Sequence, residues 1–321
     1  MRILVIVVTY NAMCWIDKCL GSVAEWDVFV VDNGSTDGTQ EYIRSHFNKV
    51  LFRQCETNVG FGRANNIGLQ YALDKGYDYV YLMNQDAWVM PGTISMLAGV
   101  SGKYPEYGVL SPMQMQADMR HIDYMFGKAA CEWKYSREMI ESWFNKDWEK
   151  EVHEVHFTNA AHWLVTRKCL MDVGGFSPVF PHYGEDNNYV DRVLFHNYKM
   201  GVVCRAVAVH DRRDRQPSKK EDAYYKCYIK PLIFLSNVSV EMGKLRRGKL
   251  VKQFALGVSA AGIGVTVKYW FKILLRYKTI RRSRERSMCK GSFLSVERDN
   301  EVTEEKVDST SKCNFSSLVQ K

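Results

Sequence analysis

The sequence predicts an α/β protein in which a mostly parallel sheet is flanked by helices. Short apolar runs alternate with segments of helical periodicity through the first hundred residues, and this alternation is typical of parallel sheets. Polar clusters follow three of the apolar runs, and in such sheets ligands bind at the carboxyl ends of the strands. Apolar residues make up 46% of the 321 residues, which is enough for a large core.

The individual elements follow from these runs. Strands are expected at residues 3–8, 27–31, 49–53 and 77–83. Helices are expected at residues 13–24, 36–47 and 62–75, and after Pro91. The strands are short apolar runs, whereas the helices repeat their apolar residues at a spacing of three or four.

The cysteines and the first residues bear on the cellular compartment. The nine cysteines are odd in number and form no CxxC pair, which indicates reduced thiols rather than a disulfide framework or a zinc site. The first apolar run, at residues 3–8, is too short for a signal peptide. We therefore expect a cytoplasmic protein.

Basic residues are concentrated near the C-terminus. The net charge is +8, but residues 244–290 contain fourteen Lys or Arg and one acid, Glu285, so the remainder is mildly acidic. Such a segment binds phosphate, in anionic lipid or in nucleic acid. Residues 254–267 are apolar but too few to span a membrane. Trp270 and Phe271 between lysines suit a helix in the membrane interface, and the alternative is a solvated helix that closes the domain.

Five motifs occur in a fixed order: VIVVTYNAMCWIDKCLGSV, VFVVDNGSTDGT, NVGFGRANNIGL, YLMNQDAWVMPGTI and GGFSPVFPHYGEDNNYVDRV. With them the chain, over about residues 2–215, resembles the family 2 glycosyltransferases, and most closely their bacterial rhamnosyltransferase-like members. The resemblance implies the GT-A fold and surface polysaccharide synthesis. It also implies an inverting transfer of a hexosyl or rhamnosyl group from a dTDP- or UDP-sugar to a glycan or lipid-linked acceptor.

The resemblance assigns the nucleotide to the loops after the first two strands. Asp32 would accept the imide N–H of uracil or thymine, with Thr9, Tyr10 and Asn11 nearby. Gly34 allows a close backbone approach because it has no Cβ. The alternative for any one cluster is that Asp and Asn simply end strands and cap helices.

A third loop, NVGFGRANN, is expected to face the donor diphosphate. Asn58, Gly60 and Arg63 lie where a helix begins, and backbone amides at a helix start, together with a guanidinium, can hold negative charge. The alternative is a glycine turn with a solvated arginine.

Asn84, Gln85 and Asp86 occupy the place of the family's DxD motif. The resemblance makes them donor-binding and makes Asp86 the one anionic protein ligand of a divalent metal, Mn²⁺ or Mg²⁺. His210 matches a histidine ligand that the family often supplies, and nitrogen favours Mn²⁺; otherwise a lone histidine after a strand is usually a surface or packing residue. Three arginines follow and could bind phosphate or stay solvated: Arg212, Arg213 and Arg215.

The stretch HYGEDNNYVDR contains the expected catalytic base. The resemblance places the base in its acid pair, and we assign Asp186, with Glu185 second. A helix predicted at 187–195 would keep a carboxylate ionised through its dipole, and a helix-capping pair is the alternative. Asn188 replaces a further acid of the family pattern, whereas Arg192 matches it.

The expected organisation has three parts: a glycosyltransferase catalytic domain at 1–240, a basic amphipathic membrane-associating segment at 241–282 and a disordered tail at 283–321. Residues 111–157, rich in aromatics, either face the acceptor or form a packed excursion. The expected partners are the donor, the acceptor and the inner face of the cell membrane, with no nucleic acid. The alternative is a non-catalytic protein that binds membrane or nucleic acid through its basic segment. A Rossmann dehydrogenase is disfavoured because no GxGxxG follows the first strand.

Overall fold

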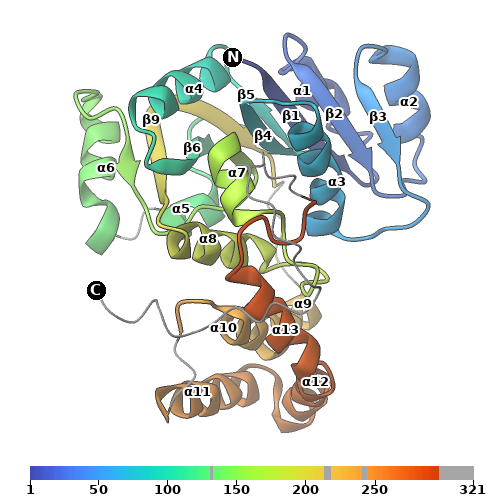
Figure 1. Ribbon diagram of the computed structural model, residues 1–321, viewed down its shortest axis with the longest axis vertical. Helices are drawn as coiled ribbons and strands as arrows, with labels where there is room; N and C mark the ends of the chain where they lie inside the picture. The colour runs from blue at the N-terminus through green and yellow to red at the C-terminus, as the bar shows by residue number, and fades with distance from the viewer. Residues whose placement is uncertain (131–132, 213–217, 241–243, 296–321) are drawn as a thin grey trace, which may run out of the picture.

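A nine-stranded sheet with helices on both faces forms the centre of the molecule (Figure 1). The computed structural model describes residues 1–130, 133–212, 218–240 and 244–295. The strands are β1 (Ile3–Thr9), β2 (Asp27–Asp32), β3 (Leu51–Gln54), β4 (Tyr79–Asn84), β5 (Ala87–Val89), β6 (Tyr107–Met115), β7 (His153–Glu154), β8 (His162–Thr166) and β9 (Lys199–His210). Their order is β3-β2-β1-β4-β8-β6-β9-β5, and β7 pairs with β9.

The helices of the sheet domain are α1 (Ile16–Gly21), α2 (Thr39–His46), α3 (Phe61–Asp74), α4 (Thr93–Lys103), α5 (Tyr124–Ala130), α6 (Trp133–Asn145), α7 (Arg167–Val173) and α8 (Glu185–Phe195). After β9 follow α9 (Lys219–Tyr224), a π-helical turn η1 (Tyr225–Ile229), α10 (Lys230–Ser236), α11 (Lys244–Ala261), α12 (Ile263–Leu275) and α13 (Tyr277–Ser287). The predicted helix at 13–24 is shortened to α1, because residues 12–15 form a turn before it.

The half of the sheet nearest the N-terminus is parallel, as predicted. β1 pairs with β2 and β4, and β2 pairs with β3. All four predicted strands are confirmed to within two residues at each end. In this register Thr9 lies beside Asp32, and Val8 lies beside Asn84. The polar clusters after β1, β2 and β4 therefore meet at one edge.

The other half of the sheet is mixed rather than parallel. β8 runs antiparallel to both β4 and β6, β6 and β9 are parallel, and β5 and β7 run antiparallel to β9. β5 cannot be a parallel neighbour of β4, because it follows β4 after only two residues and a parallel pair needs a longer crossover connection. β5 instead pairs with β9 and brings Ala87 opposite His210.

Strand β1 is buried on both faces. Its side chains alternate between two apolar clusters, as the pleat of a strand requires. One cluster includes residues of α3, α7 and α8 together with Leu4, Ile6 and Val8. The other includes residues of α1 and α4 together with Ile3, Val5 and Val7. This double burial explains why the strand is a continuous apolar run in the sequence.

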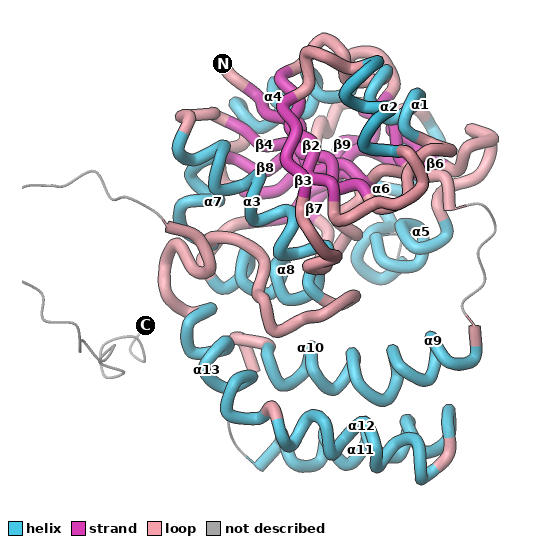
Figure 2. Tube along the Cα trace, turned by 90° about the vertical axis from the view of Figure 1, so that its right-hand side faces the viewer, coloured by secondary structure: helices cyan, strands magenta, loops and turns pink. Residues whose placement is uncertain are grey.

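The helices after β9 form a layer of their own below the sheet in Figure 1, and Figure 2 shows α9 and α10 in one row and α11 and α12 in an outer row. A third apolar cluster, with Ile229 and Leu232 fully buried, holds this layer together. Arg276 donates to the Val179 carbonyl at 3.0 Å and to the Tyr228 hydroxyl. Among the described residues, no helix combines the length and the apolar character needed to cross a membrane.

The chain beyond residue 282 differs from the disordered tail that we expected. α13 continues to Ser287, and residues 288–295, here called the C-terminal strap, pack against the sheet domain. The backbone amide of Gly291 donates to the Asp172 carbonyl at 2.9 Å, and Leu294 packs on the core. Residues 296–321 lie outside the part of the chain that the structure describes.

Backbone and polar contacts hold most of the strap. Gln70 of α3 exchanges two hydrogen bonds with the backbone of Ser295, at 2.7 and 2.9 Å. The Phe293 ring lies between the guanidinium groups of Arg192 and Arg286, with 5.2 and 5.3 Å from guanidinium carbon to ring centre. The polar composition of this segment suggested disorder, because such contacts leave little apolar pattern in a sequence.

Removal of the strap should destabilise the protein. We expect a chain truncated after Ser287 to lose about 2–4 kcal/mol of unfolding free energy, because several hydrogen bonds and the packing of Leu294 are lost. A chain truncated after Ser295 keeps the strap and serves as the control. Thermal unfolding followed by circular dichroism would test this expectation, and equal melting temperatures for the two truncations would contradict it.

Candidate active site

Asp32 ends β2 and is fully buried. Its Oδ2 accepts hydrogen bonds from the hydroxyls of Thr9 (2.9 Å) and Ser35 (2.5 Å). Its Oδ1 accepts from the backbone amides of Gly34 and Ser35 and from Gln40 Nε2. These five hydrogen bonds occupy all the acceptor positions of the carboxylate. The geometry therefore favours a role for Asp32 in positioning the loop after β2, rather than the predicted contact with a nucleotide base.

The loop after β1 is fixed to the loops after β2 and β4. The Gln85 side chain accepts from the Tyr10 amide at 2.6 Å and donates to the Tyr10 carbonyl at 3.1 Å. The Asn11 amide donates to Ser35 Oγ, and Asn11 Oδ1 accepts from the Thr36 amide, both at 2.9 Å. Gln85 and Asn11 thus hold backbone, whereas the side chain of Tyr10 is exposed at this edge.

Asn33, which the sequence analysis did not single out, joins the second and third loops. Its Nδ2 donates to Asn58 Oδ1 at 2.9 Å, and its Oδ1 accepts from the Val59 amide at 2.8 Å. Gly60 has a φ of +90°, and a Cβ there would lie 2.8 Å from the Pro181 carbonyl oxygen. The position of Asn33 directly after a strand end was the one available signal in the sequence.

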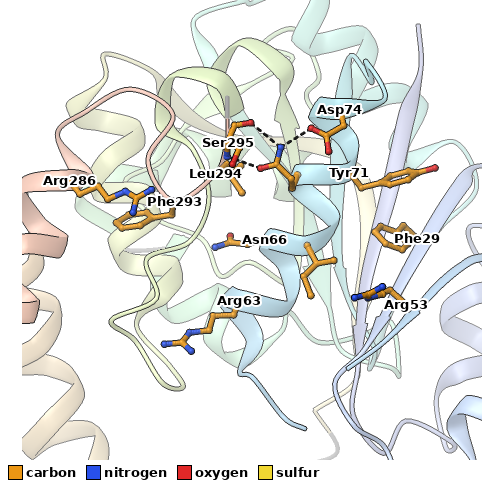
Figure 3. Close-up of a pocket in the computed structure, with 12 residues that line it drawn as sticks. Phe29, Arg53, Arg63, Asn66, Tyr71, Asp74, Arg286, Phe293, Leu294 and Ser295 are labelled. Atoms are coloured by element: carbon orange, nitrogen blue, oxygen red, sulfur yellow. Dashed lines mark hydrogen bonds between the residues drawn. The ribbon is translucent and has the colours of Figure 1, made fainter. Parts of the chain in front are cut away.

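Arg63 is exposed on the first turn of α3 and donates to the Pro178 carbonyl at 3.3 Å. It also lines a cavity of about 620 Å³ between α3, β2 and the C-terminal strap (Figure 3). Arg53 and Arg286 add two more cations to this cavity, whose described lining contains one acid, Asp74, and no histidine. We therefore place the active site by its chemistry, at the strand ends, and not by this volume.

Asn84, Asp86 and His210 lie together at the ends of β4 and β9. His210 Nε2 is 3.4 Å from Asp86 Oδ1 and 3.5 Å from Asn84 Nδ2. The other amide atom of Asn84, Oδ1, is buried without a hydrogen-bond partner. Burial opposes the ionisation of Asp86, but the hydrogen bond and charge of His210 outweigh it and lower the pKa of this carboxyl.

These three side chains fit a divalent metal. A carboxylate oxygen, an amide oxygen and an imidazole nitrogen are ligands for Mn²⁺, and the oxygens also suit Mg²⁺. The unpartnered Asn84 Oδ1 is an acceptor that such an ion would satisfy. Within the described ranges no group of three or more His, Cys, Asp or Glu side chains could hold a metal. A metal held by Asp86 and His210 would therefore also need the amide oxygen of Asn84 and oxygen atoms from the diphosphate and water as ligands.

Two further charged residues adjoin His210. The Oδ2 atom of Asp123, a buried residue, is 3.7 Å from His210 Nδ1 and 3.0 Å from Arg212 Nε. The charge of Arg212 acts on both Asp86 and Asp186. The sequence analysis missed Asp123 because it lies in a segment without a periodic pattern. Two of the predicted arginines lie outside the described residues: Arg213 and Arg215.

Glu185 and Asp186 form the first turn of α8, after Gly184 with a φ of +87°. Glu185 is buried with Oε2 unpartnered, and burial together with the charge of Asp186 raises its pKa to about 8. Asp186 keeps some exposure, and desolvation raises its pKa to about 6 despite backbone hydrogen bonds from Asn187 and Ala160. At pH 7 Asp186 is thus mostly ionised, whereas Glu185 is mostly protonated.

The segment before β8 connects the acid pair to the metal-binding candidates. The backbone of Ala160 hydrogen-bonds Asp186, and the carbonyl of the next residue, Ala161, accepts from the Asn84 amide at 3.1 Å. Neighbouring backbone groups of one segment thus contact both Asp186 and Asn84, although these two residues come from distant parts of the sequence. The loops after β1, β2 and β3 continue the same edge of the sheet.

Arg192, which matches the family pattern, has a structural role. It is fully buried and donates to Asn188 Oδ1, to the Val173 carbonyl at 2.8 Å and to the Gly175 carbonyl. Asn188 is also buried. These contacts fix α8 against α7, so Arg192 supports the helix that begins with the acid pair.

Comparisons with known proteins identify the family of the chain. Residues 4–162 match the model of the glycosyl transferase family 2. An N-acetylglucosaminyl-diphospho-decaprenol L-rhamnosyltransferase of Mycobacterium tuberculosis is 24% identical over 256 residues, which cover 69% of this chain and 81% of the relative. An undecaprenyl-phosphate mannosyltransferase of Micrococcus luteus is 34% identical over 106 residues, 30% of this chain and 43% of the relative.

Solved structures share the fold. S. aureus TarS 1–349 in complex with UDP-GlcNAc matches with a TM-score of 0.52 at 16% identity, over 90% of this chain and 89% of that chain. GalNAc-T7 with UDP, GalNAc and Mn²⁺ also gives 0.52, at 13% identity, over 87% of this chain and 57% of that chain. The motifs, the family model and the fold agree, and the chain is therefore a family 2 glycosyltransferase with the GT-A fold.

Proposed function

We propose that this glycosyltransferase moves a sugar, with inversion, from a dTDP- or UDP-sugar to a glycan or lipid-linked acceptor in surface polysaccharide synthesis. The M. tuberculosis relative is named for rhamnosyl transfer to a diphospho-decaprenol acceptor, and the M. luteus relative for undecaprenyl phosphate. These names favour a rhamnose-like sugar and a lipid-linked acceptor. The observations that support the reaction most are the 3.4 Å distance between His210 and Asp86 and the charge of Arg212, which acts on both Asp86 and Asp186.

Asp186 is the proposed general base. It takes the proton of the acceptor hydroxyl while that oxygen attacks the anomeric carbon and the bond to the nucleoside diphosphate breaks. A pKa of about 6 leaves Asp186 ionised at neutral pH, whereas a pKa of about 8 leaves Glu185 protonated. The partial exposure of Asp186 and the raised pKa of the more deeply buried Glu185 therefore support Asp186 as the base. A single displacement inverts the sugar.

The reaction also requires that the negative charge of the departing nucleoside diphosphate be neutralised. Asn84, Asp86 and His210 would hold Mn²⁺ or Mg²⁺, and such an ion neutralises the charge of the departing nucleoside diphosphate. Arg212 is ion-paired with Asp123 but partly exposed, so its guanidinium can also contact phosphate oxygens. Tyr10 and the loops after β1, β2 and β3 would hold the nucleotide along the same edge.

The outer helices supply the proposed membrane contact, at the cytoplasmic face. The exposed side chains of α12 include Ile263, Val267, Phe271 and Leu274, which recur at helical spacing and form one apolar face. Exposed lysines, among them Lys268 and Lys272, flank this face. An apolar face rimmed by cations suits an interface of anionic lipid.

Nucleic-acid binding is less well supported. Two arginines of the basic segment are used inside the molecule: Arg276 binds the Val179 carbonyl, and Arg284 binds carbonyls of residues 237–240. A nucleic-acid surface needs its cations free for phosphates. The exposed apolar residues between the remaining cations are also better matched by lipid than by a duplex.

A donor screen tests the proposed reaction. We expect the purified full-length protein to release nucleoside diphosphate from one of a panel of UDP- and dTDP-sugars when a polyprenyl-diphosphate-linked N-acetylglucosamine is added. EDTA should abolish release and excess Mn²⁺ should restore it, because the donor diphosphate needs charge neutralisation. Absence of acceptor-dependent release with every donor, in Mn²⁺ and in Mg²⁺, would contradict the proposal.

Isosteric variants can distinguish the role of Asp186 from that of Glu185. Asp186→Asn should lower kcat about 10²–10⁴-fold, because the general base is lost, with little change in nucleotide affinity. Glu185→Gln is the matched control and should retain activity within a few-fold, since Glu185 is already protonated at pH 7. In the wild type, kcat/KM should fall as the pH drops below about 6, where Asp186 becomes protonated. The reverse ranking of the two variants would show that the roles are exchanged.

The membrane contact can be tested by reversing the character of the α12 face. We expect the double variant Phe271→Glu with Leu274→Glu to reduce sedimentation with phosphatidylglycerol vesicles at least tenfold, since each buried apolar side chain contributes about 1.5–3 kcal/mol. Phe144→Glu, at an exposed site on α6, is the control and should bind like the wild type. Deletion of 244–321 is unsuitable, because α13 and the strap pack on the sheet domain. Equal binding by both variants would refute this contact surface.

A further inference from the structure

We propose that the acidic segment that follows the C-terminal strap, residues 296–308, binds in the arginine-lined cavity between α3, β2 and the strap. The contact ties the strap to β2 and β3, whose residues Phe29 and Arg53 form the opposite wall of the cavity. It involves neither the metal-binding candidates nor the acid pair of α8, so it is independent of the proposed reaction.

The cavity combines cations with apolar walls. Figure 3 shows Arg286 and Phe293 on one side and Arg53 and Phe29 on the other, and Arg63 of α3 also lines the cavity. Its volume of about 620 Å³ lies within the range of about 300–1,000 Å³ that is usual for binding pockets. Such walls suit an occupant that carries several negative charges and some apolar groups.

The charges of the three arginines are not balanced by carboxylates in the part of the chain that the structure describes. Arg63 donates to a backbone carbonyl, and the guanidinium of Arg286 lies against the Phe293 ring. The one acid of the described lining, Asp74, accepts from Gln70 at 2.7 Å. Cations that share a cavity repel one another, so the cavity favours an anionic occupant.

The segment that follows the strap has a composition that matches these walls. Ser295 lines the cavity and is the last residue that the structure describes. Residues 296–308 contain six acids and two basic residues, so they carry a net charge of 2 − 6 = −4, and they also contain three valines. Residues 309–321 contain no acid. The negative charge is therefore confined to the residues nearest to the cavity along the chain.

Attachment to the cavity wall favours this segment over a free anion. A chain spans at most about 3.3–3.6 Å per residue, so acids that follow Ser295 by two to ten residues can lie anywhere in the cavity. The three arginines are exposed, and one exposed ion pair strengthens binding by at most about fivefold. A short tether, however, gives the acids an effective concentration in the millimolar range. Several weak ion pairs therefore act together, and a free anion must compete with them.

Cleavage of the full-length chain by a glutamate-specific protease tests the contact, because the segment offers sites at Glu301, Glu304 and Glu305. We expect the double variant Arg53→Gln with Arg286→Gln to be cleaved there at least fivefold faster than the wild type, since a bound segment is protected. Salt at about 0.5 M should accelerate cleavage of the wild type in the same way, because it screens exposed charges.

The matched control for this measurement is Arg120→Gln with Arg281→Gln, since both arginines are exposed and neither lines the cavity. It should be cleaved like the wild type. Arg53→Gln alone, which leaves the ring contact of the strap intact, should still accelerate cleavage at least twofold. Equal cleavage of the wild type and both cavity variants, or equal acceleration in the control, would overturn the proposal.

A labelled peptide with the sequence of residues 296–308 provides a second test, because it competes with the tethered segment. In full-length chains with Glu301→Gln, Glu304→Gln and Glu305→Gln the tethered segment is less acidic. The peptide should bind this variant at least tenfold more tightly than the wild type in fluorescence polarisation, and Arg53→Gln should remove most of the gain. Equal affinity for the wild type and the glutamine variant would overturn the proposal. Inorganic pyrophosphate that binds both chains equally, and is lost in Arg53→Gln, would assign the cavity to a free anion and overturn it as well.

Discussion

The antiparallel pairing of β5 with β9 is the constraint on which the site depends. It sets Ala87 opposite His210, and the Asp211 amide extends the ladder to the Asp86 carbonyl at 2.7 Å. β5 is a short strand, and its pairing with β9 keeps it in the sheet. The two side chains that best suit a metal therefore face each other because of backbone hydrogen bonds, before any ion is bound.

Asp32, Asp86 and Asp186 have different roles because different groups surround each carboxylate. Asp32 is saturated by five donors and organises a loop. Asp86 lies beside His210, which keeps it ionised despite burial. Asp186 is desolvated next to a second acid at a helix start, and its raised pKa suits proton transfer. One residue type thus provides structure, charge and basicity according to the donors and cations around it.

The sequence predicted the parts of the molecule that leave a local pattern. The parallel strands were predicted because burial on both faces makes them apolar runs, and their polar ends identified the edge. Asp123 and Asn33 were missed because their partners come from other loops and from β9. The strap was missed because backbone hydrogen bonds leave no periodicity. The saturation of Asp32 likewise depends on Gln40 and Ser35, which no motif singles out.

The central claim is that Asp86 and His210 form a metal site beside the base. Crystals grown with Mn²⁺ and UDP, measured at a wavelength with strong manganese anomalous scattering, test it most directly. We predict one strong anomalous peak within coordination distance of an Asp86 oxygen and of His210 Nε2. Bound UDP with no peak there, or with manganese held by other residues, would contradict it.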